Sequence, residues 1–392
     1  MKYIAILGHG VVGGGCARML TENADRMRER VGEDVFVRYI LDVRDLPDSP
    51  FADRIVHDFN VILNDPEVSL VAEAIGGSHP AFEYAKAALE AGKHVVTSNK
   101  ECVSRFGVIL TDVAEKHGVT YRFEASCGGG IPLIGPILSD LAPNRIDSID
   151  GILNGTTNYI LTRMHRDGCS FEAALAEAQE KGYAERDPSA DVDGYDARRK
   201  INILCGCATG MLHHDEDIPV EGIRAVRACD VRAAAASGYA VKLLGRMTGG
   251  FLLVAPHLVS FDCPLSHTDG VFNAALVHGN YVGDVLLCGR GAGAEATASA
   301  MVGDIAKALC GDGGTVTFAE GGPLPDFADF TCPRYLSVGE EEADALRALV
   351  PDARPVVSPE GEFACITKPL SERDFASLAA KLPLCASLRV RE

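Results

Sequence analysis

The sequence lacks three features that would place it in other classes of protein. No apolar run among its 392 residues approaches about 18 residues, the length that a membrane-spanning helix needs. An excess of basic residues is also missing: the formal net charge is -18, and such a surface repels nucleic acid and anionic membranes. The N-terminal residues enter an apolar strand at once and contain no secretory cleavage region, so we expect a cytoplasmic protein.

Closely paired cysteines are scarce, although the chain contains 13 cysteines. Cys205 and Cys207 are separated by one residue and no second such pair accompanies them, which argues against a zinc site or a redox-active disulfide. Thiols scattered in this way through a long chain are typical of a cytosolic protein, in which they stay reduced and are mostly buried. We therefore assign the cysteines to packing.

Short apolar runs alternate with helical patterns over the first 123 residues. This alternation predicts an α/β fold with a doubly wound parallel sheet of the Rossmann type, because parallel strands need helical crossovers. The expected strands cover residues 3–7, 35–42, 68–75, 94–97 and 120–123. The expected helices cover residues 11–30, 80–91 and 105–117.

The pattern changes after residue 145 to that of a mixed α+β domain. Helices are expected over residues 155–166, 170–181 and 194–209, among strands that include 148–153 and 251–260. A glycine-rich turn at 289–293 precedes an alanine-rich helix over 294–310, which we expect to return to the first domain. Residues 331–392 have the βαββαβ order of a small ferredoxin-like module. The predicted domains are therefore 1–145 with a return segment at about 288–320, then 146–287, and 331–392.

Three glycines follow the first strand in the pattern G-x-G-x-x-G, as Gly8, Gly10 and Gly13. The first glycine allows a tight turn, the second lets backbone approach a pyrophosphate, and the third allows close packing of helix on strand. The N-terminus of the following helix faces the phosphates. In this place the pattern predicts a dinucleotide cofactor.

The second strand should end in a group that contacts the adenosine ribose. An acid at this point favours NAD, whereas an arginine accommodates the extra phosphate of NADP. This chain has both, with Asp42 at the strand end and Arg44 two residues later. We favour NADP on the strength of Arg44, and NAD stays an open alternative.

Residues 182–200 form a polar loop that leads into a helix. Asp193 is the expected N-cap, and Asp196 and Lys200 share one helix face because they are four residues apart. Glu185 and Asp191 precede them on the loop. An exposed, salt-bridged start of a helix would show the same pattern.

A second lysine lies at the edge of the sheet where ligands of such folds bind. Lys100 follows the strand at 94–97, in the stretch Thr-Ser-Asn-Lys. A carbonyl that receives hydride gains negative charge and then a proton, and an ammonium group can stabilise the charge and supply the proton. The acids of the loop could hold the ammonium group of a substrate.

The chain resembles homoserine dehydrogenase over essentially its whole length. The matching motifs, in order, are GHGVVG, AEAIGG at 72–77, TSNK at 97–100, FEASCGGGIP at 123–132, NGTTNYI at 154–160, the segment 185–200, and CGRGAGAEATASAMVGDI at 288–305. The resemblance implies reversible, NAD(P)-dependent interconversion of L-homoserine and L-aspartate 4-semialdehyde, in the biosynthesis of threonine, methionine and isoleucine. Alternatives are a non-catalytic nucleotide or amino-acid sensor, or a dehydrogenase of another small amino or hydroxy acid.

The resemblance also implies roles for individual residues, carried over by position. The catalytic group consists of Lys200, Lys100 and Asp196, and the residues that bind homoserine are Glu185 and Asp191. The cofactor-binding positions are Gly8, Gly10, Val11, Val12, Gly13, Asp42, Arg44, Ile75, Gly76, Ser98, Lys100 and Gly291. A sodium or potassium ion would be held by a carboxylate and backbone carbonyls, from Glu124, Cys127, Gly129 and Ile131.

Partners and regulation follow from the same resemblance. A homodimer is implied, and we expect helix 154–164 and strand region 251–260 of a catalytic and dimerisation domain to pack against a second subunit. The C-terminal module resembles an ACT domain, although Gly339, Glu340 and Glu341 replace the usual Asp-Arg-Pro-Gly turn. Inhibition by threonine and a purely structural role in dimerisation are therefore both open.

Overall fold

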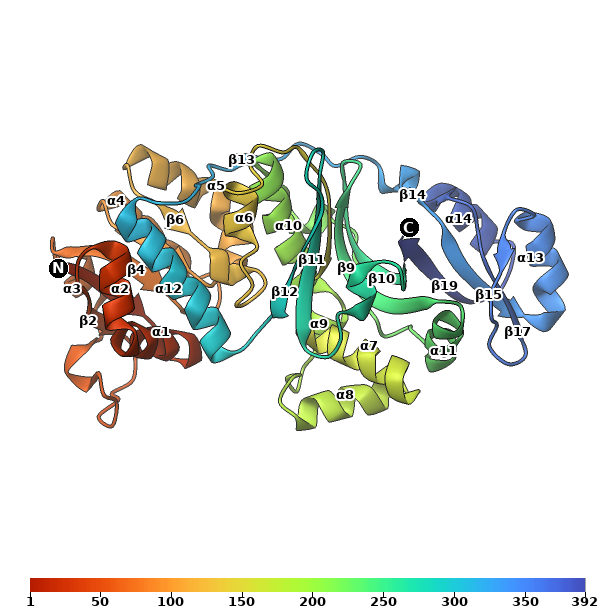
Figure 1. The fold of residues 1–392 in the computed structure, drawn as a ribbon, viewed down its shortest axis with the longest axis horizontal. Helices are drawn as coiled ribbons and strands as arrows, with labels where there is room; N and C mark the ends of the chain where they lie inside the picture. The colour runs from red at the N-terminus through yellow and green to blue at the C-terminus, as the bar shows by residue number, and fades with distance from the viewer. Residues whose placement is uncertain (392) are drawn as a thin grey trace.

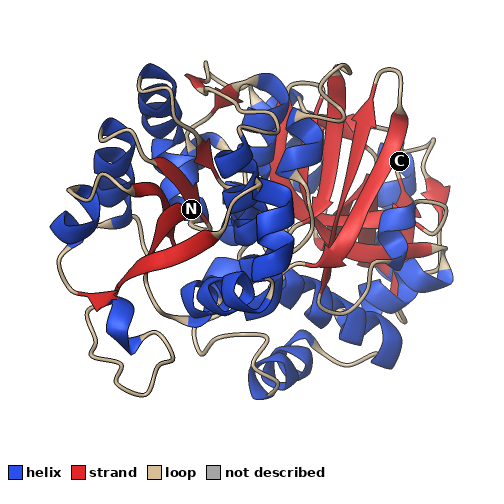
Figure 2. Cartoon of the chain, turned by 60° about the vertical axis from the view of Figure 1, so that its left-hand side comes forward, coloured by secondary structure: helices blue, strands red, loops and turns tan. Residues whose placement is uncertain are grey.

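Six parallel strands form the first sheet of the computed structural model, which describes residues 1–391. Their spatial order is β3-β2-β1-β4-β5-β6, which confirms the predicted Rossmann-type sheet. Helices lie against it (Figure 2). The strands are β1 (Lys2–Leu7), β2 (Val35–Leu41), β3 (Ile55–Val56), β4 (Val68–Glu73), β5 (His94–Thr97) and β6 (Tyr121–Arg122).

The helices of this region differ from expectation at two points. The helix expected over 11–30 divides at Asn23, which leaves the helical conformation and serves both as the C-cap of one helix and as the N-cap of the next. A second helix begins at Lys100 rather than near residue 105, because the side chain of Asn99 caps it by accepting a hydrogen bond from the backbone N–H of Cys102. The helices are α1 (Val11–Glu22), α2 (Ala24–Val31), α3 (Phe59–Leu63), α4 (Ala81–Glu90), α5 (Lys100–Lys116) and α6 (Ile134–Leu138).

A helix from late in the chain completes this part of the molecule. Helix α12 (Ala294–Cys310) runs beside α1 in Figure 1, and its apolar face shares a core with residues of α1, β1 and β4. The contact is close at Gly15, where an added Cβ would lie 3.1 Å from the Cβ of Ala298. The glycine therefore sets how near the two helices approach.

A nine-stranded mixed sheet occupies the rest of the molecule, in the order β12-β11-β7-β9-β10-β19-β15-β17-β16. Its strands are β7 (Ile146–Ile152), β9 (Tyr239–Thr248), β10 (Phe251–Ser260), β11 (Phe272–Gly279), β12 (Gly283–Arg290), β15 (Arg334–Gly339), β16 (Arg354–Pro355), β17 (Glu362–Ile366) and β19 (Leu384–Arg391). Helices in this part are α7 (Gly155–Asp167), α8 (Phe171–Glu180), α9 (Ser189–Val192), α10 (Tyr195–Thr209), α11 (Ala228–Ala236), α13 (Ala343–Leu349) and α14 (Glu372–Ala379). Two small sheets pair β8 (Met211–Leu212) with β13 (Ala319–Glu320) and β14 (Thr331–Cys332) with β18 (Leu370–Ser371).

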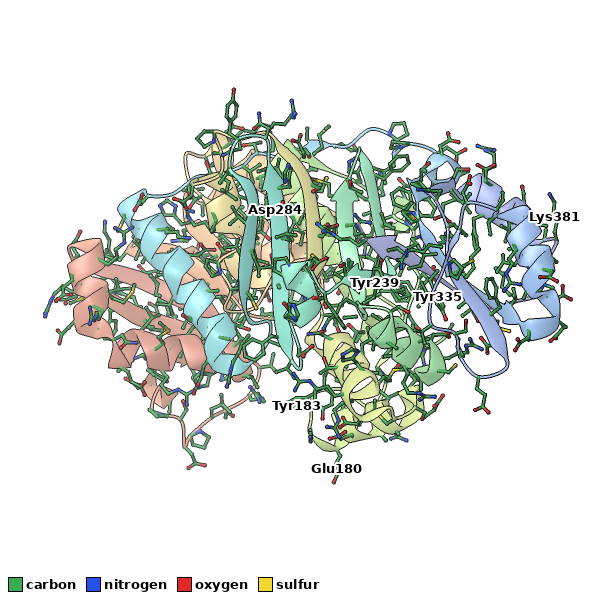
Figure 3. All side chains as sticks on the ribbon, turned by 45° about the vertical axis from the view of Figure 1, so that its right-hand side comes forward. Glu180, Tyr183, Tyr239, Asp284, Tyr335 and Lys381 are labelled. Carbon is green, nitrogen blue, oxygen red and sulfur yellow. The ribbon has the colours of Figure 1, made fainter. Side chains whose placement is uncertain are left out.

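The C-terminal strands have the antiparallel order β19-β15-β17-β16, which confirms the predicted βαββαβ arrangement. The strands of this module do not form a separate sheet, because β19 pairs in parallel with β10 and so joins them to the rest of the nine-stranded sheet. The pairing covers the edge of β10, which would otherwise expose unpaired backbone groups. Tyr335 (Figure 3) reinforces the junction, since its hydroxyl donates a hydrogen bond of 3.0 Å to Asp230 of α11.

The two segments expected to form a dimer interface are mostly buried within the chain. Residues 156–162 of α7 are buried within the chain itself, and so are residues 252–259 of β10. Both segments pack into the chain's own core, because β10 lies in the interior of the nine-stranded sheet and α7 covers strands of that sheet. These segments therefore offer no free face to a second subunit.

Among residues 1–391, no helix combines the length and the apolar character that crossing a membrane requires.

Candidate active site

The glycine turn after β1 has the geometry that its spacing predicts. Gly8 has a φ of +92°, and an added Cβ there would lie 2.8 Å from the carbonyl oxygen of Ala74. A Cβ on Gly13 would lie only 1.9 Å from the carbonyl oxygen of Gly8, so strand and helix touch at this point. A Cβ on Gly10 would meet no atom within 4 Å. The turn is therefore packed on one side and open at Gly10, the side on which a pyrophosphate would approach the start of α1.

The two candidate ribose contacts, Asp42 and Arg44, bind one another. Nε of Arg44 lies 2.9 Å from Oδ1 of Asp42, and Nη2 lies 3.0 Å from Oδ2. The backbone N–H of His9 also donates to this carboxylate, at 2.9 Å. The hydrogen bond from Arg44 and those from the backbone hold the pKa of Asp42 well below its ordinary value, although burial opposes them. Acid and arginine thus form one unit beside the glycine turn.

Two lysines from different helices meet at one buried carboxylate, that of Asp196 in the first turn of α10. Nζ of Lys200, one turn further along α10, lies 2.7 Å from Oδ2 of Asp196. Nζ of Lys100, the first residue of α5, lies 2.8 Å from Oδ1 of the same carboxylate. Lys200 is buried, whereas 40% of the Lys100 side chain is exposed. The cluster therefore joins helices α5 and α10.

The charges of this cluster support one another. Burial raises the pKa of Asp196, but the ammonium groups of Lys200 and Lys100 outweigh it and hold that pKa well below its ordinary value. Burial lowers the pKa of Lys100, but the Asp196 carboxylate outweighs it and raises that pKa. At neutral pH Asp196 is therefore an anion and Lys100 a cation.

Asn154, to which the sequence analysis gave no role, organises the acids around this cluster. Its side-chain nitrogen lies 2.6 Å from Oδ1 of Asp191 and 2.9 Å from Oδ2 of Asp196. Its side-chain oxygen caps α7 by accepting a hydrogen bond from the backbone N–H of Thr157. Asparagine directly before a helix is an N-cap signal, and the motif Asn-Gly-Thr-Thr could have revealed the capping role. Nζ of Lys200 donates in addition to the carbonyl oxygen of Leu153, at 2.8 Å.

The loop before α10 is arranged differently from expectation. Asp193 does not cap α10; Gly194 occupies that position with a φ of +87°, and Asp193 pairs with Arg224 at 2.6 Å. Asp191 lies in the short helix α9 and reaches the cluster through Asn154. Glu185 is exposed on the loop that follows Tyr183 (Figure 3), and its carboxylate makes no hydrogen bond or ion pair with residues 1–391. The structure thus brings Asp191 into the cluster and leaves Glu185 outside it.

Residues 124–131 form the candidate cation segment, and the structure differs from the expectation at the side chain of Glu124. The carboxylate of Glu124 accepts backbone hydrogen bonds from Leu133, Ile134 and Gly135, at 2.6–2.8 Å. It therefore caps the start of α6 and is not a free ligand. Within residues 1–391, no cluster of three or more His, Cys, Asp or Glu side chains suits a metal ion. Backbone carbonyls are the oxygen donors that this segment can still offer.

Three remaining cofactor candidates lie at the ends of β4 and β5. Ile75 and Gly76 follow β4, and Ser98 follows β5, which places them at the carboxyl edge of the first sheet. From the other side, Gly291 packs against the cation segment so closely that a Cβ on Gly129 would lie 2.5 Å from its carbonyl carbon. The structure therefore brings the turn at 289–293 against the turn that contains Gly129.

Comparisons with known proteins agree with this geometry. A family model described as "Homoserine dehydrogenase" matches residues 132–306, and one described as "Homoserine dehydrogenase, NAD binding domain" matches residues 8–124. A homoserine dehydrogenase from Synechocystis sp. is 40% identical over 334 residues, which cover 82% of this chain and 76% of the relative. The crystal structure of a homoserine dehydrogenase from Thiobacillus denitrificans has a TM-score of 0.90 and 32% identity, and the match covers 100% of this chain and 98% of the other.

A hyperthermophilic archaeal homoserine dehydrogenase, solved in complex with NADPH, has a TM-score of 0.68 and 29% identity, covering 80% of this chain and 100% of its own. The matches do not favour a non-catalytic sensor or a dehydrogenase of another small acid. They cover the nucleotide turn, the cluster around Asp196 and the sheet that supports it. This chain therefore belongs to the homoserine dehydrogenase family and is an NAD(P)-dependent oxidoreductase.

Proposed function

We propose that Lys200 transfers the proton in the interconversion of L-homoserine and L-aspartate 4-semialdehyde, with Lys100 and Asp196 as its catalytic partners. The observation that carries this proposal is the single buried carboxylate shared by two lysines. Asp196 orients Lys200 from one turn earlier in α10. The raised pKa of Lys100 keeps this side chain cationic, and a fixed cation suits the stabilisation of negative charge on the substrate oxygen. In reduction, Lys200 would donate the proton that this oxygen needs, and in oxidation it would accept the proton.

The substrate ammonium would be held by carboxylates of the same loop. Asp191 lies beside Asp196 through their common partner Asn154, so a cation placed there would face two acids. Glu185 is exposed on this loop and would complete the set once homoserine is bound. A plain hydroxy acid has no ammonium group for these acids to bind, which favours an amino-acid substrate.

A dinucleotide fits the glycine turn, and its nicotinamide accepts or supplies the hydride when it is bound. The pyrophosphate would be held by Gly8, Gly10, Val11, Val12 and Gly13, and the nicotinamide side by Ile75, Gly76, Ser98, Lys100 and Gly291. Arg44 would turn from Asp42 to the 2′-phosphate of NADP, whereas Asp42 would accept the ribose hydroxyls of NAD. We favour NADP, which the archaeal homologue binds in its reduced form.

The remaining proposals concern an ion, a second subunit and an effector. Backbone carbonyls of Glu124, Cys127, Gly129 and Ile131 would coordinate sodium or potassium, because hard ions prefer oxygen donors. The family resemblance favours a homodimer, and the N-terminal sequence and scattered cysteines favour the cytoplasm. The proposed domains are 1–145 with a return segment at about 288–320, then 146–287, and 331–392. The βαββαβ module would act as an ACT-like unit.

The direct test compares two substrates that differ in one group. Purified enzyme is assayed at alkaline pH with NADP and with NAD, using L-homoserine and 4-hydroxybutyrate, which lacks the amino group. We expect turnover of homoserine and a kcat/KM for 4-hydroxybutyrate lower by at least about a hundredfold, because the acids near Asn154 would face no cation. Equal turnover of the two would contradict the proposed substrate, and no turnover with either would contradict the proposed reaction.

A further inference from the structure

One buried carboxyl group lies between the ends of β4 and β5 and has no part in the chemistry above. Glu73, the last residue of β4, is 1% exposed and forms no ion pair with any of residues 1–391. Its Oε1 accepts a hydrogen bond of 2.6 Å from the backbone N–H of Ile75. Its Oε2 accepts the hydroxyl hydrogen of Thr97, the last residue of β5. One carboxylate therefore ties together two strand ends of the cofactor edge.

The hydrogen bonds continue from Thr97 to the start of helix α5. Oγ1 of Thr97 accepts a hydrogen bond of 2.9 Å from the backbone N–H of Asn99. The side-chain nitrogen of Asn99 donates to the carbonyl oxygens of Ile75 at 3.1 Å and Gly77 at 2.6 Å, while its side-chain oxygen caps α5. Helix α5 begins at Lys100, so the chain of hydrogen bonds that starts at Glu73 ends at a catalytic lysine.

The surroundings of Glu73 contain no charge to balance its own. The titratable groups that face it are Cys102 on α5 and Tyr121 on β6, and burial raises the pKa of the thiol to about 12 and that of the phenol well above its ordinary value. Both are therefore neutral. Burial raises the pKa of Glu73 to about 7, although hydrogen bonds from Thr97, Ile75 and Asn99 oppose this. The group changes its charge within the working range of an enzyme.

Protonation would reverse a hydrogen bond in this chain. The ionised carboxylate accepts from both the Ile75 N–H and the Thr97 hydroxyl. A carboxyl protonated on Oε2 would instead donate to Thr97, whose oxygen already accepts from Asn99. The Thr97 hydroxyl hydrogen would then lose its acceptor, and a buried donor without a partner is unfavourable. The loops after β4 and β5 would shift to satisfy it.

We propose that Glu73 is a positioning residue for hydride transfer, and that its carboxylate holds the 75–77 turn and the start of α5 in the places that the nicotinamide and Lys100 require. This inference rests on the proposed function. Glu73 lies in the sequence motif AEAIGG, of which only Ile75 and Gly76 are expected to bind the cofactor.

The test uses Glu73→Gln, which keeps the shape and removes the charge, with Glu90→Gln as the matched control. Glu90 is an exposed residue of α4 that pairs with Lys86 and lies outside the site. The measurement is kcat and KM for homoserine and NADP from pH 6 to 9, together with nucleotide affinity by fluorescence. We expect an ionisation near pH 7 in log kcat of the wild type and of E90Q that is absent from E73Q. We also expect kcat of E73Q to fall about tenfold or more, as for a small misplacement of catalytic groups.

A second variant keeps the proposal testable if E73Q does not fold. Thr97→Val retains the carboxylate but removes the hydroxyl that links it to Asn99, and it should lower kcat in the same way. A kcat of E73Q within about twofold of E90Q, or an ionisation near pH 7 that persists in E73Q, would overturn the proposal. A loss of kcat equal at every pH, with only reduced thermal stability, would also overturn it in favour of a merely structural role. Absence of wild-type turnover would instead refute the proposed function.

Discussion

Replacement of Asp196 by asparagine should separate the charge of the cluster from its shape. The amide has the same size but can no longer be an anion between two lysines. Nζ of Lys200 would keep its 2.8 Å contact with the carbonyl oxygen of Leu153 and lose the charge-assisted hydrogen bond of 2.7 Å to Asp196. Such a bond contributes about 1.5–3 kcal/mol, which converts to a decrease of about 10- to 150-fold in kcat if it orients the proton-transferring group.

The same substitution should move the pH profile. A cationic Lys100 would stabilise negative charge on the substrate oxygen, so the rate falls once the pH is high enough for this ammonium to lose its proton. The carboxylate of Asp196 raises the pKa of Lys100, and its removal therefore lowers that pKa. We expect the alkaline limb of the kcat profile to move to lower pH by about one unit or more, equivalent to about 1.4 kcal/mol.

The assay follows nicotinamide absorbance from pH 6 to 10, and its matched control is Asp193→Asn. Asp193 lies three positions earlier and pairs with Arg224, outside the cluster. This control should show wild-type kinetics and an unchanged profile. If D196N keeps both its kcat within about twofold and the position of its alkaline limb, then the carboxylate does not act on the two lysines as proposed.

Three further expectations concern the nucleotide end. Arg44→Ala should weaken NADP binding by about tenfold or more and shift preference toward NAD, because it removes the phosphate partner and frees Asp42, as fluorescence titration with both cofactors would show. Gly13→Ala should abolish tight nucleotide binding and lower the thermal midpoint, since its Cβ would lie 1.9 Å from the carbonyl oxygen of Gly8; a variant with wild-type affinity would contradict this packing. The pKa of Glu73 is raised in the folded protein, so its contribution to stability is fully present below about pH 4.5 and is lost as the pH rises through about 7. Unfolding in urea between pH 5 and 8 should therefore show the wild type losing stability relative to E73Q as the pH rises, by up to about 1.4 kcal/mol per pH unit.

The first sheet could be predicted from the sequence because its signals are local. Buried parallel strands are short apolar runs, and the glycine at position 8 marks the turn that ends β1. The early start of α5 was missed because Asn99 and Lys100 were read as the end of a strand. The capping potential of Asn99 is itself local, but only the structure shows that its side chain also binds the turn at 75–77.

The site could be predicted only in part, because its contacts join distant segments. The i,i+4 spacing of Asp196 and Lys200 indicates their pairing, whereas the approach of Lys100 depends on how α5 packs against α10. The role of Asn154 as a bridge between two acids depends on the fold in the same way. The pairing of β19 with β10 carries no local signal either, since a strand does not specify its neighbour in a sheet.

The proposed proton transfer by Lys200 is tested most directly by measuring turnover of homoserine in the variant Lys200→Ala. Homoserine oxidation is measured beside NADPH affinity, so that loss of chemistry can be told from loss of binding. The expected result is a kcat lower by at least about a hundredfold, with NADPH affinity within about twofold of the wild type. Normal turnover in the variant would contradict the claim.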